Sequence, residues 1–179
     1  MVGGAVSTIL LQTRRSTHDI DFFAEGLAKQ DGKLLYEAAA VVRSQPGSRL
    51  EEDWINNRTI YFIAPTLRQE LTRCGFEQND IVFSAPGLTL YAAPWSYAFV
   101  SKFDRIQGGG HRSHDPGDAA VYLDKWLRSK QQSNIPVAAI ADTIRRYQLK
   151  VAREQDFMDA LRKVNDAYQS RLGRRPIQQ

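Results

Sequence analysis

The chain has 179 residues, of which 42% are hydrophobic and 25% are charged, and its formal net charge is +4. This length and composition fit one globular domain, or one domain with a helical appendage, and exclude the disordered and fibrous classes. A single cysteine excludes an internal disulfide and a cysteine-based zinc site. The sequence has no run of about 18 apolar residues and no basic segment followed by an apolar one. We therefore expect no membrane span and no secretory signal, and a location in the cytoplasm or the nucleus.

The chain opens with two glycines, Gly3 and Gly4, followed by a predicted short helix over residues 5–12. Two glycines let the backbone approach a ligand closely, and a helix that begins just after them directs free N–H groups at an anion. Ser7 on this helix is a candidate phosphate contact, although a helical serine more often faces solvent. Arg15 in the next loop either reaches phosphate or is an ordinary solvated charge.

A short strand follows, on which Asp19 and Asp21 alternate with Ile20 and Phe22. Side chains two positions apart on a strand share a face, so both carboxylates point one way and both apolar residues the other. Two adjacent carboxylates repel each other unless a cation lies between them, and oxygen ligands suit Mg²⁺ carrying a polyphosphate. Such pairs are also common on solvated strand edges, so the pattern alone leaves both interpretations open.

The rest of the chain alternates between helical and extended patterns. Helices are predicted at residues 31–44, 67–76, 95–107 and 118–128, strands at 59–63, 81–83 and 88–91, and further helices after Pro136 with apolar stripes over 140–147 and 157–172. The predicted fold class is α+β, with a small mixed β-sheet flanked by helices and with C-terminal helices packed alongside. We predict one domain over residues 1–128 and a helical extension over residues 129–179.

Positive charge is concentrated near the end of the sequence. Residues 128–179 carry 11 Lys and Arg against 5 Asp and Glu, whereas residues 1–127 carry 13 against 15. This surplus fits an electrostatic footprint for RNA. A solvated helix face has the same composition and is the commoner explanation.

The first motif is similar to a known signature. The two glycines, a short helix and the stretch Arg15-Ser16-Thr17-His18-Asp19-Ile20-Asp21 resemble the DNA polymerase β-type nucleotidyltransferase superfamily. More narrowly, the chain resembles minimal nucleotidyltransferase-like proteins related to the nucleotidyltransferase toxins of abortive-infection systems. Three later stretches resemble the same group: Trp54-x-Asn56, Gly87 to Leu90 followed by Pro94 and Lys102, and Arg112-x-x-Asp115-x-x-Asp118. The resemblance covers about residues 2–128. Members carry a strand ahead of the two glycines, so the first strand is expected to be truncated here.

The resemblance implies a nucleotidyltransferase fold and roles for particular residues. Asp19 and Asp21 would bind Mg²⁺. The nucleotide would be contacted by Gly3, Gly4, Ser7 and Arg15, and Lys102 would pair with its triphosphate. Asp115, with Asp118 as the alternative, would position the base or the acceptor. Lys102 also fits a surface lysine, and Asp115 fits an ordinary helix-start turn. The third carboxylate that the superfamily carries on a following strand is missing, because residues 59–63 and 88–91 contain no acid.

Two functions from different classes follow from these patterns. The first is an enzyme that transfers NMP from a nucleoside triphosphate to a hydroxyl of an RNA, such as tRNA, or of a protein, with Mg²⁺ as the cofactor. The second is a catalytically inactive nucleotide- or partner-binding module of the same fold, which the missing acid favours. A structural, antitoxin-like partner is a third reading, supported only by the helical tail. For the first function we expect Asp19, Asp21 and Lys102 to surround one cleft closed by Gly3 and Gly4.

Overall fold

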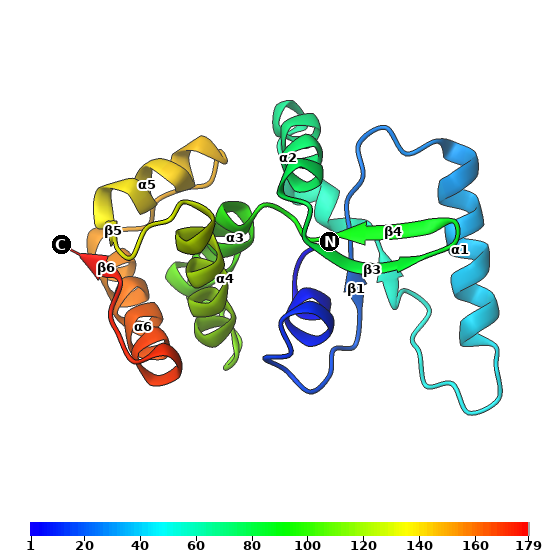
Figure 1. Cartoon of the computed structure of the whole chain (residues 1–179), viewed down its shortest axis with the longest axis horizontal. Helices are drawn as coiled ribbons and strands as arrows, with labels where there is room; N and C mark the ends of the chain where they lie inside the picture. The colour runs from blue at the N-terminus through cyan, green and yellow to red at the C-terminus, as the bar shows by residue number, and fades with distance from the viewer. Residues whose placement is uncertain (179) are drawn as a thin grey trace. The chain divides into compact units, whose positions relative to one another are not determined.

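The protein is described by a computed structural model that covers residues 1–178. It is a mixed α+β structure in which helices flank small sheets (Figure 1). The chain divides into two compact units, Met1–Ala93 and a second that begins at Pro94, and each is described by itself. The domain boundary predicted after residue 128 lies at the end of helix α4 (Asp115–Ser129), within the second unit. Because α4 packs against two other helices of the second unit, this helix joins the C-terminal helices in one core.

The first unit contains most of the extended structure. Its elements are η1 (Val6–Leu10, a π-helix), β1 (Ile20–Asp21), α1 (Lys29–Arg43), β2 (Ile55–Asn56), η2 (Arg58–Phe62, a 3₁₀-helix), α2 (Pro65–Gln78), β3 (Ile81–Ala85) and β4 (Leu88–Tyr91). The expected strands at 81–83 and 88–91 are confirmed as the antiparallel hairpin β3–β4. In Figure 1 this hairpin extends toward α1. The helices predicted at 31–44 and 67–76 are confirmed as α1 and α2.

Strand β1 lies at the centre of the backbone pairing in the first unit. On one edge it pairs in parallel with β2, with Ile20 opposite Ile55 and Asp21 opposite Asn56. On its other edge Val2 pairs antiparallel with Asp21, and the Val2 N–H donates to the Asp21 carbonyl over 3.1 Å. A strand of two residues is therefore held by hydrogen bonds on both sides.

The first two residues connect β1 to the hairpin. The Met1 nitrogen donates to the Tyr91 carbonyl over 2.6 Å, and the Ala93 N–H donates to the Met1 carbonyl over 2.7 Å. This alternation is that of neighbouring parallel strands. Backbone hydrogen bonds thus run from the hairpin through Met1 and Val2 to β1 and β2. The pairing is mixed, as predicted, but it consists of short ladders instead of one extended sheet.

The strand predicted at residues 59–63 is wrong, because η2 occupies this stretch. Its Tyr61 and Phe62 side chains are each 79% exposed, so neither has the neighbouring sheet surface that gives aromatic residues their strand preference. The Arg68 guanidinium instead donates to the carbonyls of Ile60 and Ile63 over 3.1 and 3.2 Å, which satisfies the turn. The strand that neighbours β1 is β2, a few residues earlier in the sequence.

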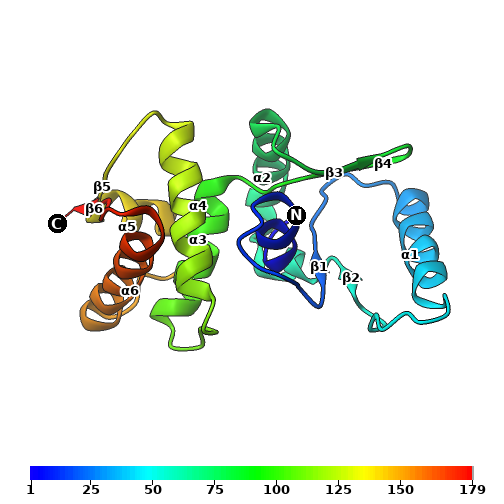
Figure 2. The ribbon, with the colours of Figure 1, turned by 60° about the horizontal axis from the view of Figure 1, so that its bottom comes forward.

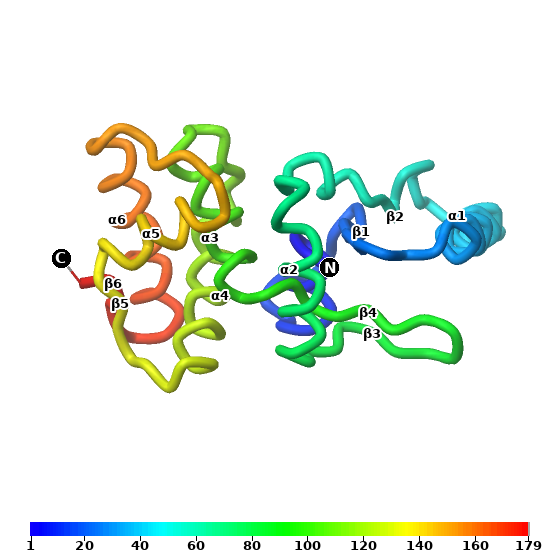
Figure 3. Tube along the Cα trace, turned by 90° about the horizontal axis from the view of Figure 1, so that it is seen from above, coloured from blue at the N-terminus to red at the C-terminus, as the bar shows by residue number. Residues whose placement is uncertain are grey.

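The second unit is mainly helical and is built on packed aromatic rings. Its elements are α3 (Trp95–Gln107), α4 (Asp115–Ser129), β5 (Ile135–Pro136), α5 (Val137–Arg146), α6 (Glu154–Leu172) and β6 (Ile177–Gln178). Helices α3 and α4 lie side by side and α6 packs against both, as Figures 2 and 3 show. Phe99 and Phe103 are fully buried between them, and their rings contact Trp126 and Phe157. The predicted C-terminal helices are thus confirmed.

A buried polar contact ties α6 to α4. The hydroxyl of Tyr168, which is fully buried, donates to Asp124 Oδ1 over 2.7 Å. Arg174 donates to the same hydroxyl over 2.7 Å, and Arg128 pairs with the other Asp124 oxygen over 2.7 Å. Burial, with the neighbouring Asp124 carboxylate, raises the pKa of Tyr168 to about 12. The hydroxyl therefore stays protonated, and a donor, at neutral pH.

We predict that Tyr168→Phe lowers the free energy of unfolding by about 1–3 kcal/mol, because a buried carboxylate oxygen loses its donor. Chemical unfolding followed by circular dichroism measures this change. Tyr36→Phe is the matched control, since Tyr36 is 42% exposed, and we expect it to change stability little. Equal stability of Tyr168→Phe and the wild type would show that this contact does not hold α6.

Candidate functional site

The two aspartates of the first motif lie in strand β1 and directly before it. Asp21 is in β1, and Asp19 comes two residues earlier, directly before the strand begins. The Ile20 and Phe22 N–H groups donate to the Trp54 and Asn56 carbonyls over 2.6 and 2.9 Å, which holds the backbone of this segment on both sides of Asp21. Both aspartates are half-buried, and Phe22 is buried in the core as predicted, whereas Ile20, which was also expected there, is half-buried like the aspartates.

The two glycines pack directly against this segment. Gly3 has a φ of +74°, in the left-handed region that favours glycine, and a Cβ at this position would lie 3.2 Å from Asp21 Oδ2. A Cβ on Gly4 would lie 2.4 Å from Thr17 Oγ1 and 2.8 Å from Arg14 Nη1, too close for any side chain. The absence of a side chain at both positions therefore makes room for the groups around the aspartates.

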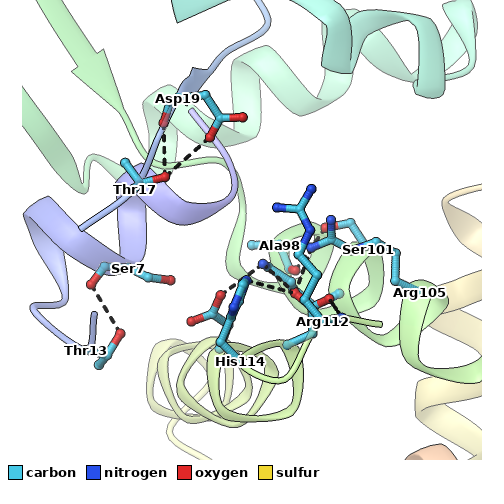
Figure 4. Close-up of polar contacts among 12 residues, drawn as sticks. Ser7, Thr13, Thr17, Asp19, Ala98, Ser101, Arg105, Arg112 and His114 are labelled. Carbon is cyan, nitrogen blue, oxygen red and sulfur yellow. Dashed lines mark hydrogen bonds and ion pairs between the residues drawn. The ribbon is translucent and has the colours of Figure 1, made fainter. Parts of the chain in front are cut away.

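Thr17 orients Asp19 from two residues away. Its hydroxyl donates to the Asp19 backbone carbonyl over 3.2 Å and lies 3.3 Å from Asp19 Oδ1 (Figure 4). Because Gly4 has no Cβ, the Thr17 hydroxyl fits beside it and reaches the carboxylate. We name Gly3, Gly4, Thr17, Asp19 and Asp21 the aspartate-pair site. The sequence motif predicted four of these residues as ligand contacts, and Thr17, expected from the sequence to order the turn before Asp19, is found to orient it.

Two other candidates on this motif have different environments. Ser7 is completely buried in η1, so the expectation that it faces solvent is wrong. Its backbone carbonyl accepts hydrogen bonds from the Thr13 N–H over 2.8 Å and from the Thr13 hydroxyl over 3.2 Å (Figure 4). Arg15 is exposed in the loop that leads to Asp19. The predicted helix over residues 5–12 is confirmed only as the π-helical segment Val6–Leu10, too short for a substantial helix dipole.

Asn56 lies opposite Asp21 on the neighbouring strand β2. The two strands pair in parallel, and Asn56 is buried. Its side-chain amide donates to the Asp53 carbonyl over 3.3 Å, and its oxygen accepts from the Arg58 N–H over 3.0 Å. In the sequence this residue belongs to the Trp54-x-Asn56 stretch. Its pairing with β1 was not predicted, because the neighbouring strand was expected at residues 59–63.

Lys102 and Asp115 belong to a buried ion cluster in the second unit. The Lys102 ammonium lies 2.9 Å from Asp115 Oδ1 and 2.9 Å from Asp118 Oδ2, and all three side chains are at least 96% buried. Arg105 also donates to Asp115 Oδ1 over 2.8 Å, and the Arg112 N–H donates to Asp115 Oδ2 over 2.9 Å. Arg105, Arg112 and the adjacent His114 are drawn in Figure 4. We name Lys102, Arg105, Asp115 and Asp118 the lysine cluster.

The electrostatics of the lysine cluster are dominated by these contacts. Burial alone raises the pKa of the Asp115 carboxyl. The hydrogen bonds from Lys102 and from the Arg112 N–H, with the charges of Lys102 and Arg105, outweigh burial and hold that pKa below its usual range. Asp115 is therefore ionised at neutral pH, and it fixes the N-terminal end of α4 to α3.

Two aspartates of the lysine cluster, together with His114, form a group that could hold a metal ion. His114, Asp115 and Asp118 each offer a ligand atom, and these atoms lie within 4.8 Å of one another. This group has the spacing to hold a metal ion. The Lys102 ammonium already bridges its two carboxylates, so an ion would have to compete with a resident charge.

The predicted site residues thus form two groups, each within one unit. Gly3, Gly4, Asp19 and Asp21 come together in the first unit, and Lys102 and Asp115 come together in the second. That both groups line a single cleft stays a prediction.

The basic surplus of the C-terminal segment is partly neutralised by neighbours on the same helices. Arg145 pairs with Asp142 on α5, and Arg153 pairs with Asp156, both over about 3 Å. Arg162 pairs with Asp159 on α6. All of these side chains are well exposed. This arrangement favours the interpretation as a solvated helix face over a dedicated RNA surface.

Comparison with known proteins adds no relative to this picture: no family model, no curated protein and no solved structure matches the chain. In addition, none of the helices within residues 1–178 combines the length and the apolar character needed to cross a bilayer.

We predict that Lys102→Met lowers the free energy of unfolding by about 3–5 kcal/mol, because removal of the ammonium leaves buried carboxylates without their main counter-charge. Denaturant unfolding measures the loss. Lys130→Met, at the exposed end of α4, is the control and should change stability by less than about 0.5 kcal/mol. An unchanged free energy of unfolding for Lys102→Met would contradict a stabilising role of the ammonium.

The Asp115 pKa predicts a dependence of stability on pH. A carboxyl whose folded-state pKa is lowered stabilises the protein above its unfolded-state pKa of about 3.9 and loses this contribution as the pH falls through the folded-state value. The stability advantage of the wild type over Asp115→Asn should therefore shrink as the pH is lowered from about 7 toward about 3. Unfolding curves across this range measure it, with Asp142→Asn, an exposed acid, as the control. A pH-independent difference would contradict the assignment.

Proposed function

We propose that this chain is a nucleotidyltransferase of the DNA polymerase β type, similar to the minimal proteins related to abortive-infection toxins. It would transfer NMP from a nucleoside triphosphate to a hydroxyl of an RNA, such as tRNA, or of a protein. One observation carries the proposal: Gly3 and Gly4, far from Asp21 in sequence, pack against Asp21 and Thr17 so closely that no Cβ fits at Gly4. The signature combines two glycines with an acidic pair, and here the packing around the acidic pair requires the glycines.

The aspartate-pair site fits a divalent cation by its donor chemistry. Carboxylate oxygens of Asp19 and Asp21 are the hard ligands that Mg²⁺ prefers, with water and phosphate completing its shell. A Cβ at Gly3 would lie 3.2 Å from Asp21 Oδ2, so glycine at this position spares that oxygen a close contact. When bound there, Mg²⁺ would neutralise charge on the triphosphate and on the departing pyrophosphate.

The residues of this chain have distinct parts in the proposed transfer. Asp19 and Asp21 hold the cation, and the Thr17 hydroxyl keeps the Asp19 carboxylate oriented. Gly3 and Gly4 make room for the Asp21 carboxylate and the Thr17 hydroxyl, and Arg15 supplies an exposed positive charge for the triphosphate. In the reaction the acceptor oxygen bonds to the α-phosphorus, the bond from that phosphorus to pyrophosphate breaks, and the acceptor hydroxyl releases its proton. Lys102 as a triphosphate contact stays a prediction, since its ammonium binds Asp115 and Asp118.

Asn56 supports the second candidate, an inactive module that binds nucleotide without transferring it. The position next to Asp21 on the paired strand carries a neutral amide, and both of its polar atoms are used by the local turn. Two-metal chemistry needs anionic ligands shared between two cations. An amide in place of the third carboxylate supplies no charge for a second cation, so binding without transfer is the alternative outcome of the test below.

We predict that Asp21→Asn abolishes transfer of label from any nucleoside triphosphate and leaves the fold intact. Loss of one carboxylate leaves the cation under-coordinated, whereas a ligand-facing carboxylate contributes little to packing. Wild-type protein is incubated with each labelled triphosphate, Mg²⁺ and mixed tRNA or cell lysate. Melting curves with Mg²⁺-ATP and Mg²⁺-CTP report binding separately, because a ligand that binds the native state at about 100 times its Kd adds about 2.7 kcal/mol.

Asp31→Asn is the matched control, since Asp31 is an exposed aspartate on α1, and we expect normal binding and transfer. A melting shift that Asp21→Asn removes, without transfer in the wild type, selects the inactive binding module. The absence of any shift for every triphosphate at millimolar concentration would contradict both candidates.

A further inference from the structure

The first unit contains a pocket of about 380 Å³ that the proposed function does not use. Its wall is formed by the segment after β1, by α2, by β4 and by Leu35 of α1, elements that Figure 3 shows from above. Large apolar side chains make up most of this wall, among them Phe22, Leu71, Phe76 and Leu90. Pockets of a few hundred cubic ångströms with mainly apolar walls and few polar groups are typical of small-molecule sites.

The pocket walls are held in place by contacts on several sides. Leu71 of α2 is almost completely buried, and the rings of Phe76 and Tyr91 meet edge to face at 5.1 Å. The Glu25 N–H donates to the Thr72 hydroxyl over 3.4 Å, which joins the loop after β1 to α2. The wall is thus built from secondary structure on two sides and from a tethered loop on the third.

The charge of the lining determines the class of ligand. Glu25, which is exposed, is its one acidic side chain, and the lining, made entirely of residues that the structure describes, includes no Lys, Arg or His. The Met1 amine also belongs to the lining, but burial lowers its pKa to about 5, so it is uncharged at neutral pH. A phosphate or carboxylate would find no counter-charge here and would face a carboxylate. An apolar molecule with a positive charge satisfies both the wall and Glu25. This excludes the triphosphate of the proposed reaction and distinguishes the pocket from the aspartate-pair site.

We propose that this pocket binds a small aromatic amine, with its ring against the apolar wall and its ammonium group near Glu25. The ring gains the burial of apolar surface, and aromatic walls also favour a cation that lies over a ring face. The proposal stands independently of nucleotidyl transfer, because it uses neither Asp19 nor Asp21.

Three probes of one ring system and different charge test the proposal: tryptamine, tryptophol and indole-3-acetate, which are cationic, neutral and anionic. Binding to the full chain is followed by amide chemical shifts, and the shifts should map to β4 and to the Phe22–Leu27 segment. We expect tryptamine to bind at least about fivefold more tightly than indole-3-acetate at low salt. High salt should reduce this preference.

Variants separate the role of the charge from the role of the cavity. Glu25→Gln should bring tryptamine and indole-3-acetate to within about twofold of each other, whereas Glu51→Gln, an exposed acid outside the pocket, should leave the preference unchanged. Ala24→Phe should fill the pocket and weaken all three probes. Leu88→Phe on the opposite wall does the same if Ala24→Phe fails to fold. Ala85→Phe, which lies across the hairpin from Leu88 and outside the pocket, is the control for added bulk.

The outcomes decide the proposal without reference to catalysis. Binding of tryptamine that Glu25→Gln weakens and Mg²⁺-ATP does not displace supports a separate amine site. Equal binding of the three probes, or no binding to the wild type, overturns it. Displacement of tryptamine by Mg²⁺-ATP also overturns it, because the pocket would then belong to the nucleotide site. A failure of nucleotidyl transfer alone leaves the prediction for tryptamine unchanged.

Discussion

The close packing of Gly3 against Asp21 of β1, and of Gly4 against Thr17 in the loop before it, is the constraint on which the first unit depends. A strand of two residues has little stability of its own, and β1 persists because Val2 hydrogen-bonds to one edge and β2 to the other. That close packing is open only to glycine, since a Cβ at Gly4 would collide with Thr17 and Arg14. The same requirement fixes Thr17, and through its hydroxyl the orientation of Asp19. Packing and site geometry therefore have one cause.

The aspartates of the lysine cluster and those of the aspartate-pair site differ in burial. In the lysine cluster a buried ammonium lies 2.9 Å from each of two aspartates, so the charges are balanced within the protein. A buried pair of this kind contributes specificity more than net stability, because its desolvation costs about as much as its attraction returns. The aspartate pair is half-buried and lies beside two glycines. The proposed function places Mg²⁺ at this pair, and the lysine cluster serves the packing of α3 on α4.

Asn56 bears on whether the protein transfers a nucleotide or only binds one. Its place opposite Asp21 follows from the parallel register of β1 and β2, and its side chain closes the turn that leads into η2. Replacement of this amide by a carboxylate would add negative charge beside Asp21 and would also disturb that turn. The residue therefore serves local structure opposite Asp21, and under the proposed function transfer would depend on the aspartate pair alone.

The sequence by itself determined the elements whose signals are local. Helical spacing of apolar residues located α1, α2 and α3, and the turn at Pro86-Gly87 located the hairpin β3–β4. The residues Gly3, Gly4, Asp19 and Asp21 were predicted as one motif, and the structure brings the two glycines against Asp21 and Thr17. Tertiary structure alone decided the partners of these elements. The stretch at 59–63 has a strand composition but no sheet surface to pack on, and the apolar pocket is formed by segments from five separate parts of the chain. Lys102 lies thirteen residues from Asp115, and only the packing of α3 on α4 made it the counter-charge of a buried acid. Long-range pairing depends on which surfaces meet, and no local pattern encodes that.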